Sequence, residues 1–164
     1  MSQIQTVCFT GHRDICPEHM LRLPTLLESV LLSLIGQGAS CFRAGGAMGF
    51  DTLAALKVLE LRAEYPRIAL HLYLPCRDQT RGWDDMSKRA YHYVLERADH
   101  VRYISENYTP TCMLQRDRAL VDGSDLCLAY CTRNRGGTFY TCSYACKTDV
   151  TLRNLYDELP RVEG

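Results

Sequence analysis

Apolar residues in this sequence follow two spacings that alternate along the chain. Six short segments are rich in β-branched and apolar residues, which is typical of strands. Longer segments between them repeat apolar residues every three or four positions, which predicts helices with one buried face. The predicted strands span residues 4–9, 39–44, 67–74, 100–105, 125–131 and 149–155. The predicted helices span residues 24–35, 50–61, 83–98, 111–122 and 138–147.

This order of elements predicts an α/β fold. Strand and helix alternate throughout, and the connections are long enough to cross over, which favours a mostly parallel sheet covered on both faces. The segment 125–131 is almost wholly apolar, so we expect it in the middle of the sheet. We therefore predict a Rossmann-like three-layer sandwich. Because no repeat or linker interrupts the pattern, residues 1–164 are predicted to form a single domain.

Composition narrows the classes of function. Lys plus Arg and Asp plus Glu are equal at 19 each, so the net charge is zero and the chain is not expected to bind nucleic acid. The nine cysteines are odd in number and lie mostly in apolar segments, which favours free buried thiols over zinc or disulfides. No run is long and apolar enough to cross a bilayer, and the first residues do not resemble a signal peptide. A cytoplasmic protein without membrane contact, metal or cofactor is expected.

The candidate chemistry lies in the turns after the strands. Ligands of open parallel sheets bind at the carboxyl ends of the strands, and two of these turns place glycines before a helix, where free amides attract anions. The turns are "TGHR" (10–13), "AGGAMGFD" (44–51), "PCRDQTRGW" (75–83), "SENYTPTC" (105–112) and "TRNRGGT" (132–138). The arginines in them that could bond a phosphate are Arg13, Arg77, Arg81, Arg133 and Arg135. Neither glycine turn matches the dinucleotide or Walker fingerprint.

Several single residues allow both a functional and a structural interpretation. His12 could donate to a phosphate or act as an acid or base, or could only form a structural hydrogen bond. Trp83 could stack on a base or pack on a helix face, and Asp51 could accept ribose hydroxyls or stabilise a helix start. Arg116 and Asp117 fall on the apolar face of their helix, where charge is costly. They form either an internal salt bridge or a polar wall of the ligand pocket.

Together these segments resemble a known family. "FTGHR", "AGGAMGFD", the long run from Trp83 to Tyr130 and "RGGTFYTCSYA" are similar to the YpsA-like bacterial and phage branch of the SLOG superfamily. That superfamily also holds DprA, the LOG phosphoribohydrolases and nucleotide sensors of antiphage systems. The resemblance implies a Rossmann-like fold with a nucleotide-derived ligand and two glycine motifs. The predicted ligand-binding residues are Gly11, His12, Arg13, Gly45, Gly46, Gly49, Asp51, Arg77, Asp78, Trp83, Arg116, Asp117, Gly136, Gly137 and Thr138.

The resemblance also bears on catalysis. LOG enzymes carry a glutamate three residues after the threonine of the second motif, and this chain has Thr141 there. Without that carboxylate, cleavage of an N-glycosidic bond loses its natural acid or base, and no catalytic residue is assigned, although Asp51, Asp78 or Asp117 could replace it. Where YpsA-like sequences typically carry asparagine, this chain has Asp117.

Three functions follow as hypotheses. The first is a sensor or sequestering protein that binds an ADP-ribose-like ligand or a nucleoside phosphate without turnover. The alternative is a nucleoside 5'-monophosphate phosphoribohydrolase, and the second alternative is a DNA-processing interaction module. A homo-oligomer, dimeric or higher, is also expected.

Overall fold

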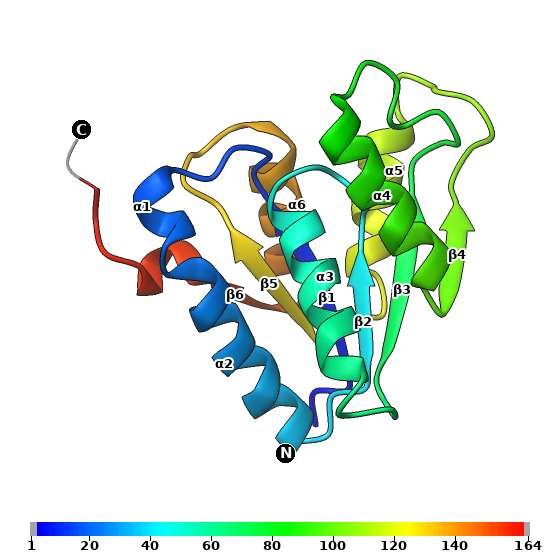
Figure 1. The fold of residues 1–164 in the computed structure, drawn as a ribbon. Coiled ribbons are helices and arrows are strands. Elements are labelled where there is room, and N and C mark those ends of the chain that lie inside the picture. Colours follow the sequence, from blue (N-terminus) through cyan, green and yellow to red (C-terminus); the bar gives the residue numbers. More distant parts are fainter. Residues whose placement is uncertain (1–2, 163–164) are drawn as a thin grey trace.

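The computed structural model describes residues 3–162, and its centre is a six-stranded parallel sheet. The strand order is β4-β3-β2-β1-β5-β6 (Figure 1). The strands are β1 (Thr6–Gly11), β2 (Cys41–Ala44), β3 (Ala69–Leu74), β4 (His100–Tyr103), β5 (Leu126–Tyr130) and β6 (Thr151–Asn154). This sheet confirms the predicted α/β Rossmann-like class.

Helices cover both faces of the sheet. In Figure 1, α2, α3 and α4 lie in front of the strands, and α5 and α6 lie behind them. The helices are α1 (Pro17–Met20), α2 (Leu23–Gly36), α3 (Phe50–Arg62), α4 (Asp85–Arg97), α5 (Cys112–Val121), α6 (Gly136–Lys147) and the 3-10 helix η1 (Leu155–Glu158). No helix within residues 3–162 has both the length and the apolar character needed to span a bilayer.

Alternate side chains of the strands supply the two halves of the core. Val7 and Phe9 of β1 belong to the larger cluster, which packs under α2, α3 and α4. Cys8 points to the opposite face and packs with Leu120 of α5 and Ala145 of α6. All five residues of β5 are buried, as its apolar sequence predicted, and the strand lies inside the sheet between β1 and β6, second from the edge and not in the middle. Because all the strands are parallel, their carboxyl ends lie at the same edge of the sheet, and the loops that follow them meet there.

The structure differs from the predicted elements at short or terminal segments. The helices α1 and η1 have four residues each, too few for an apolar period to appear in the sequence. Helix α6 begins at Gly136, two residues earlier than predicted, and Gly136 has φ +89°, a backbone angle that favours glycine. The second glycine motif therefore forms the N-terminus of α6, which we call the mouth of this helix.

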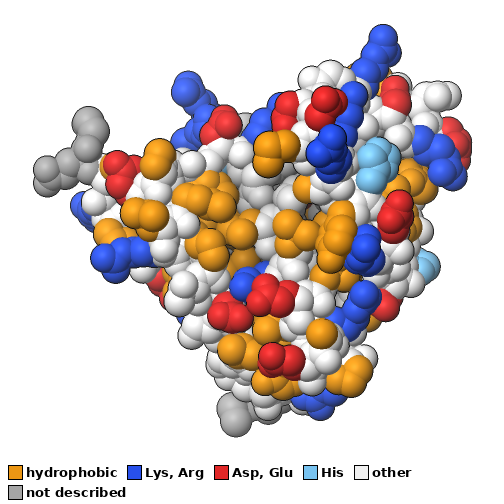
Figure 2. Space-filling view, viewed as in Figure 1, with side chains coloured by type: hydrophobic (Ala, Val, Ile, Leu, Met, Phe, Trp, Pro, Cys, Tyr) orange, Lys and Arg blue, Asp and Glu red, His pale blue; other side chains and the backbone are white. Residues whose placement is uncertain are grey.

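Charge is mixed on the face shown in Figure 2. Hydrophobic side chains gather over the middle of this face, and Lys and Arg side chains lie among Asp and Glu side chains around them (Figure 2). A polyanion would meet both signs of charge on this side of the molecule.

Candidate functional site

The strand order reverses between β1 and β5, and a pocket opens at that point. After β1 the chain continues to β2 on one side, and after β5 it continues to β6 on the other side. The loops that follow β1 and β5 therefore diverge. In open α/β sheets this is where ligands bind. The pocket has a volume of about 360 Å³ and we call it the switch-point pocket. Its lining residues are His12, Arg133, Arg135, Gly136, Gly137 and Thr138.

His12 is held rigidly in the wall of this pocket. Its backbone N–H donates to the carbonyl of Tyr130 at 3.2 Å, and its Nε2 accepts the backbone N–H of Thr132 at 2.8 Å. Burial, with the nearby charge of Arg133, lowers the pKa of His12, which favours the neutral ring. Since Nε2 accepts, the ring hydrogen is on Nδ1. His12 is therefore a structural bridge between the two loops that keeps one donor for a further group.

The mouth of α6 supplies the positive side of the pocket. The N-cap residue Arg135 forms no side-chain cap bond, so the first amides of α6 have no partner from it. Gly136 and Gly137 are exposed and allow a ligand to approach the backbone. Arg133 and Arg135 are exposed too, and neither forms an ion pair within residues 3–162. This combination fits an anion with several oxygen atoms.

The first glycine turn is engaged from inside the protein. The carbonyl of Gly45 accepts hydrogen bonds from the guanidinium of Arg116 and, at 3.3 Å, from the amide of Gln79. The amide of Ala47 donates to Asp51 Oδ2 at 3.4 Å, so the carboxylate of Asp51 meets the start of α3. A Cβ on Gly45 would lie 2.8 Å from an Arg116 nitrogen, which explains the glycine. At this turn the side chain of Asp51 accepts the amide of Ala47, one of the amides that the glycine motif was predicted to offer to a phosphate.

Gly49 fixes how this turn meets the loop after β1. It has φ +80°, and a Cβ there would overlap the carbonyl of Arg13. We expect Gly49→Ala to lower the free energy of unfolding by about 2 kcal/mol, because both the backbone angle and the contact become unfavourable. Urea denaturation measures this change. Gly36→Ala is the matched control: Gly36 ends α2 with open space around it, so alanine should change stability by less than about 1 kcal/mol. Equal losses in both variants would contradict the role given to Gly49.

A buried ionic cluster lies behind the first turn and consists of Asp51, Arg116 and Asp117. Arg116 Nε donates to Asp117 Oδ1 at 2.8 Å, and all three residues are at most 8% exposed. Burial, reinforced by the charge of Asp117 and opposed by that of Arg116, raises the pKa of Asp51 to about 7. Burial also raises the pKa of Asp117. One guanidinium thus faces two carboxyl groups, and Asp51 exchanges a proton near neutral pH.

The buried ionic cluster reaches the second glycine turn as well. A Cβ on Gly137 would lie 4.0 Å from Asp117 Oδ2. Thr141, at the position of the LOG glutamate, donates from its hydroxyl to the carbonyl of Gly137 at 2.9 Å. Arg116 and Asp117 therefore form the predicted internal salt bridge, and the same pair lies under the mouth of α6.

The loop after β3 contributes less directly. Arg77 is exposed, pairs with Glu106 at 2.7 Å and lies over the ring of Tyr103 at 4.2 Å. Asp78 is exposed next to it. Trp83 is half-buried and packs edge-on against Tyr91 at 5.7 Å, so its ring is in contact with a helix face. None of Arg77, Asp78 and Trp83 lines the switch-point pocket.

Other predicted residues lie around these groups. The backbone of Gly11 ends β1, and a Cβ there would overlap Phe50, so this glycine permits close packing against α3. The side chain of Arg13 is exposed. A Cβ on Gly46 would contact Leu74 and would lie 3.3 Å from Gln79 Oε1.

Sequence reasoning missed Gln79. Its amide holds Gly45, and its Oε1 has no hydrogen-bond partner within the described residues, as is also true of Asp51 Oδ1 and Tyr91 Oη. Its place in a loop at the carboxyl end of a strand is the one signal that the sequence carries for it. Within residues 3–162, no group of three or more His, Cys, Asp or Glu side chains is placed to hold a metal ion.

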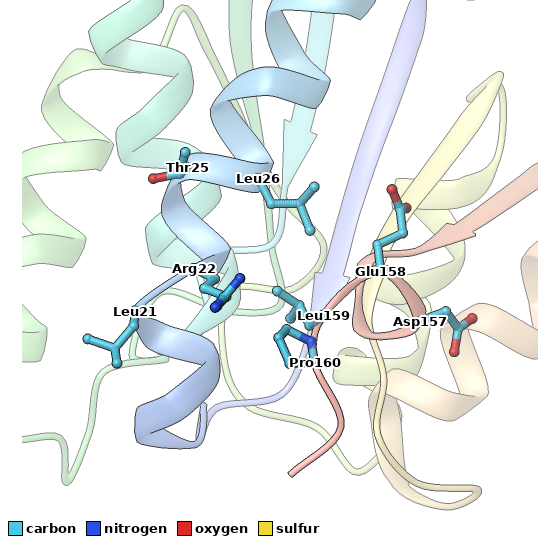
Figure 3. Close-up of a pocket in the computed structure, with 8 residues that line it drawn as sticks. All are labelled: Leu21, Arg22, Thr25, Leu26, Asp157, Glu158, Leu159 and Pro160. Carbon is cyan, nitrogen blue, oxygen red and sulfur yellow. The ribbon is translucent and has the colours of Figure 1, made fainter.

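A second hollow of about 670 Å³ lies between the start of α2 and η1, which follows β6. Figure 3 shows its lining, in which Arg22 and Leu26 from the start of α2 point toward Leu159 and Pro160 after η1. Glu158 in this lining already pairs with Arg153 at 2.7 Å. None of the predicted ligand-binding residues lines this second hollow.

Two solved structures share this fold. DprA from Streptococcus pneumoniae superposes with a TM-score of 0.65 and 17% identity over 91% of this chain and 49% of that chain. DprA from Helicobacter pylori, described for its unique single-stranded DNA binding mode, gives 0.64 and 18% over 92% of this chain and 64% of that chain. The prediction that nucleic acid is not a partner is therefore wrong. Zero net charge is no ground for excluding it, since a protein of this fold binds single-stranded DNA.

Sequence comparison gives the family. The chain is 30% identical over 113 residues to a UPF0398 protein of Halalkalibacterium halodurans, covering 68% of this chain and 60% of that protein. It is 26% identical over 114 residues to a UPF0398 protein of Bacillus thuringiensis, covering 68% and 62%. The match thus spans about three fifths of these relatives' length. A model described as the YspA SLOG family matches residues 18–157, and the chain belongs to this YpsA family.

Proposed function

We propose that this protein binds a nucleotide or nucleotide-derived ligand through a phosphate group in the switch-point pocket. The observation that carries the proposal is the open mouth of α6 at the point where the strand order reverses, beside Arg133 and Arg135, which form no ion pair in the described part of the chain. A guanidinium group can donate two parallel hydrogen bonds to the oxygens of one phosphate, and His12 Nδ1 adds a neutral donor. The first glycine turn, already engaged by Arg116 and Asp51, orients the pocket without contacting the phosphate.

Binding without turnover is the form of this function that we propose. Thr141 is buried and bonded to the backbone of its own helix, so it offers no acid or base to a sugar. Asp117 is the nearest carboxyl group below Gly137, and its bond to Arg116 holds it in the buried ionic cluster. A sensor or sequestering protein of the ADP-ribose or nucleoside-phosphate class fits these contacts.

Arg135→Ala is expected to weaken binding of AMP or ADP-ribose about tenfold, because one charge-assisted bond to the phosphate is lost. Thermal stabilisation by each nucleotide measures the effect. Arg89→Ala, an exposed arginine of α4, is the control and should bind as the unchanged protein does. No stabilisation by any nucleotide, or equal stabilisation of both variants, would contradict the proposed site. Release of free base from AMP would instead identify a phosphoribohydrolase.

Single-stranded nucleic acid is a second candidate ligand. The likeness in fold to DprA from Helicobacter pylori, described for single-stranded DNA binding, favours it. A strand with a terminal phosphate could present that group to the same helix mouth. Competition tests whether the two ligands share a site: if AMP displaces a labelled oligonucleotide, both use the switch-point pocket, and if it does not, the strand binds elsewhere.

A further inference from the structure

Two adjoining hollows flank α5 on the face that lies behind the sheet in Figure 1. One, of about 460 Å³, lies between α5 and the strands β2, β3 and β4, and its lining includes Arg102, Tyr73 and Arg118. The other, of about 360 Å³, lies between α5 and α6, and its lining includes Arg118, Tyr140 and Lys147. Arg118 borders both hollows, so they form one continuous surface. We call it the α5–α6 basic face; its members are Tyr73, Arg102, Arg118, Tyr140, Tyr144 and Lys147.

The cations of this surface are available to a ligand. Arg102, Arg118 and Lys147 are exposed, and none forms an ion pair within residues 3–162. Asp122 is the acidic residue in the lining, and its Oδ1 accepts the hydroxyl of Tyr144 at 2.7 Å. The surface therefore has an excess of positive charge although the whole chain is neutral.

Aromatic rings hold the arginines in place. Arg102 lies over the ring of Tyr73 at 5.8 Å, and Arg118 lies 5.9 Å from the ring of Tyr140 and 5.7 Å from that of Tyr144. Arg118 Nε also donates to the hydroxyl of Tyr140 at 2.6 Å. Such contacts keep flat guanidinium groups ordered at the surface, where unpaired bases stack on guanidinium and aromatic planes alike.

We propose that the α5–α6 basic face binds a single-stranded nucleic acid, with Arg102, Arg118 and Lys147 on phosphates and the guanidinium planes, together with the half-buried rings of Tyr140 and Tyr144, under the bases. It rests on the second candidate function above and assigns it a surface outside the switch-point pocket. Cations interleaved with planar groups along a continuous groove are the features that bind single strands with little sequence preference. An acidic peptide would satisfy the cations and leave the planes unused, and a base-paired duplex would not expose its bases to them.

The test uses a fluorescein-labelled dT20 oligonucleotide and the triple variant Arg102→Ala, Arg118→Ala, Lys147→Ala. Anisotropy titrations should show at least a tenfold loss of affinity, and the slope of log affinity against log salt should fall by about 2, or roughly 0.7 per lost contact. The control replaces three exposed arginines elsewhere, Arg22, Arg89 and Arg161, with alanine and should change neither quantity. Stabilisation of the triple variant by AMP shows that it is folded and tests the proposed pocket separately.

Four results would overturn the proposal. Absence of dT20 binding to the unchanged protein would do so, even if AMP still stabilises it. Full dT20 affinity in the triple variant, with loss in Arg135→Ala, would place the strand in the switch-point pocket alone. Competition by polyglutamate as effective as by unlabelled dT20 would identify an acidic peptide, and stronger binding of duplex than of single strand would exclude the stacking role.

Discussion

Arg116→Met is expected to lower the free energy of unfolding by about 3–5 kcal/mol at pH 8. The substitution removes the cation that faces Asp51 and Asp117, and a buried charge left without its partner costs this much. The carbonyl of Gly45 loses a donor as well. The loss should be smaller at pH 5, because both carboxyl groups have raised pKa values and take up protons more readily in the folded state. Urea denaturation at the two pH values measures it.

Arg118→Met is the matched control for this variant. Arg118 lies on the same helix two residues later, is exposed, and contacts Tyr140 without an acidic partner in the described chain. Its replacement should change stability by less than about 1 kcal/mol. If Arg116→Met were as stable as Arg118→Met, the buried ionic cluster would not hold the two glycine turns.

Asp51→Asn should remove about 3 kcal/mol of pH dependence between pH 5 and pH 8. The folded protein holds a proton on Asp51 up to about pH 7, whereas the unfolded chain releases it near pH 4. Stability of the unchanged protein therefore falls as pH rises through this window, by about 1.4 kcal/mol per pH unit below pH 7. Asparagine carries no such proton, so the variant should be more stable than the unchanged protein at pH 8.

Asp85→Asn provides the comparison for Asp51. Asp85 also lies in the first turn of a helix, but its side chain is exposed. Its replacement should leave the pH dependence of stability as it was. A flat pH profile of the unchanged protein between pH 5 and 8, or equal profiles for Asp51→Asn and the unchanged protein, would show that Asp51 is ionised throughout.

The sequence predicted the fold because the fold depends on periodic burial. The apolar run 125–131 identified a strand covered on both sides, and β5 is the strand found there. Helical spacing likewise placed Arg116 and Asp117 on the apolar face of α5, where both are buried. The short helices α1 and η1 escaped prediction because four residues give no period.

The inner contacts of the candidate site depend on long-range approach, which spacing does not encode. The bond from Arg116 to Gly45 joins residues 71 positions apart, and the bond from Gln79 joins residues 34 apart. Glycines before a helix predict room for an anion, but they do not reveal that Asp51 and Arg116 already hydrogen-bond the backbone of the first turn. That distinction required Asp51 and Arg116 to be placed in three dimensions.

Arg116 has a consequence for how the site comes apart. Its guanidinium bonds the carbonyl of Gly45 and the carboxylate of Asp117, which lies below Gly137. Local unfolding of the first glycine turn must break the bond from Arg116 to Gly45, so this turn opens only when it separates from α5. The stability of this part of the site therefore depends strongly on Arg116, a residue that no ligand needs to touch.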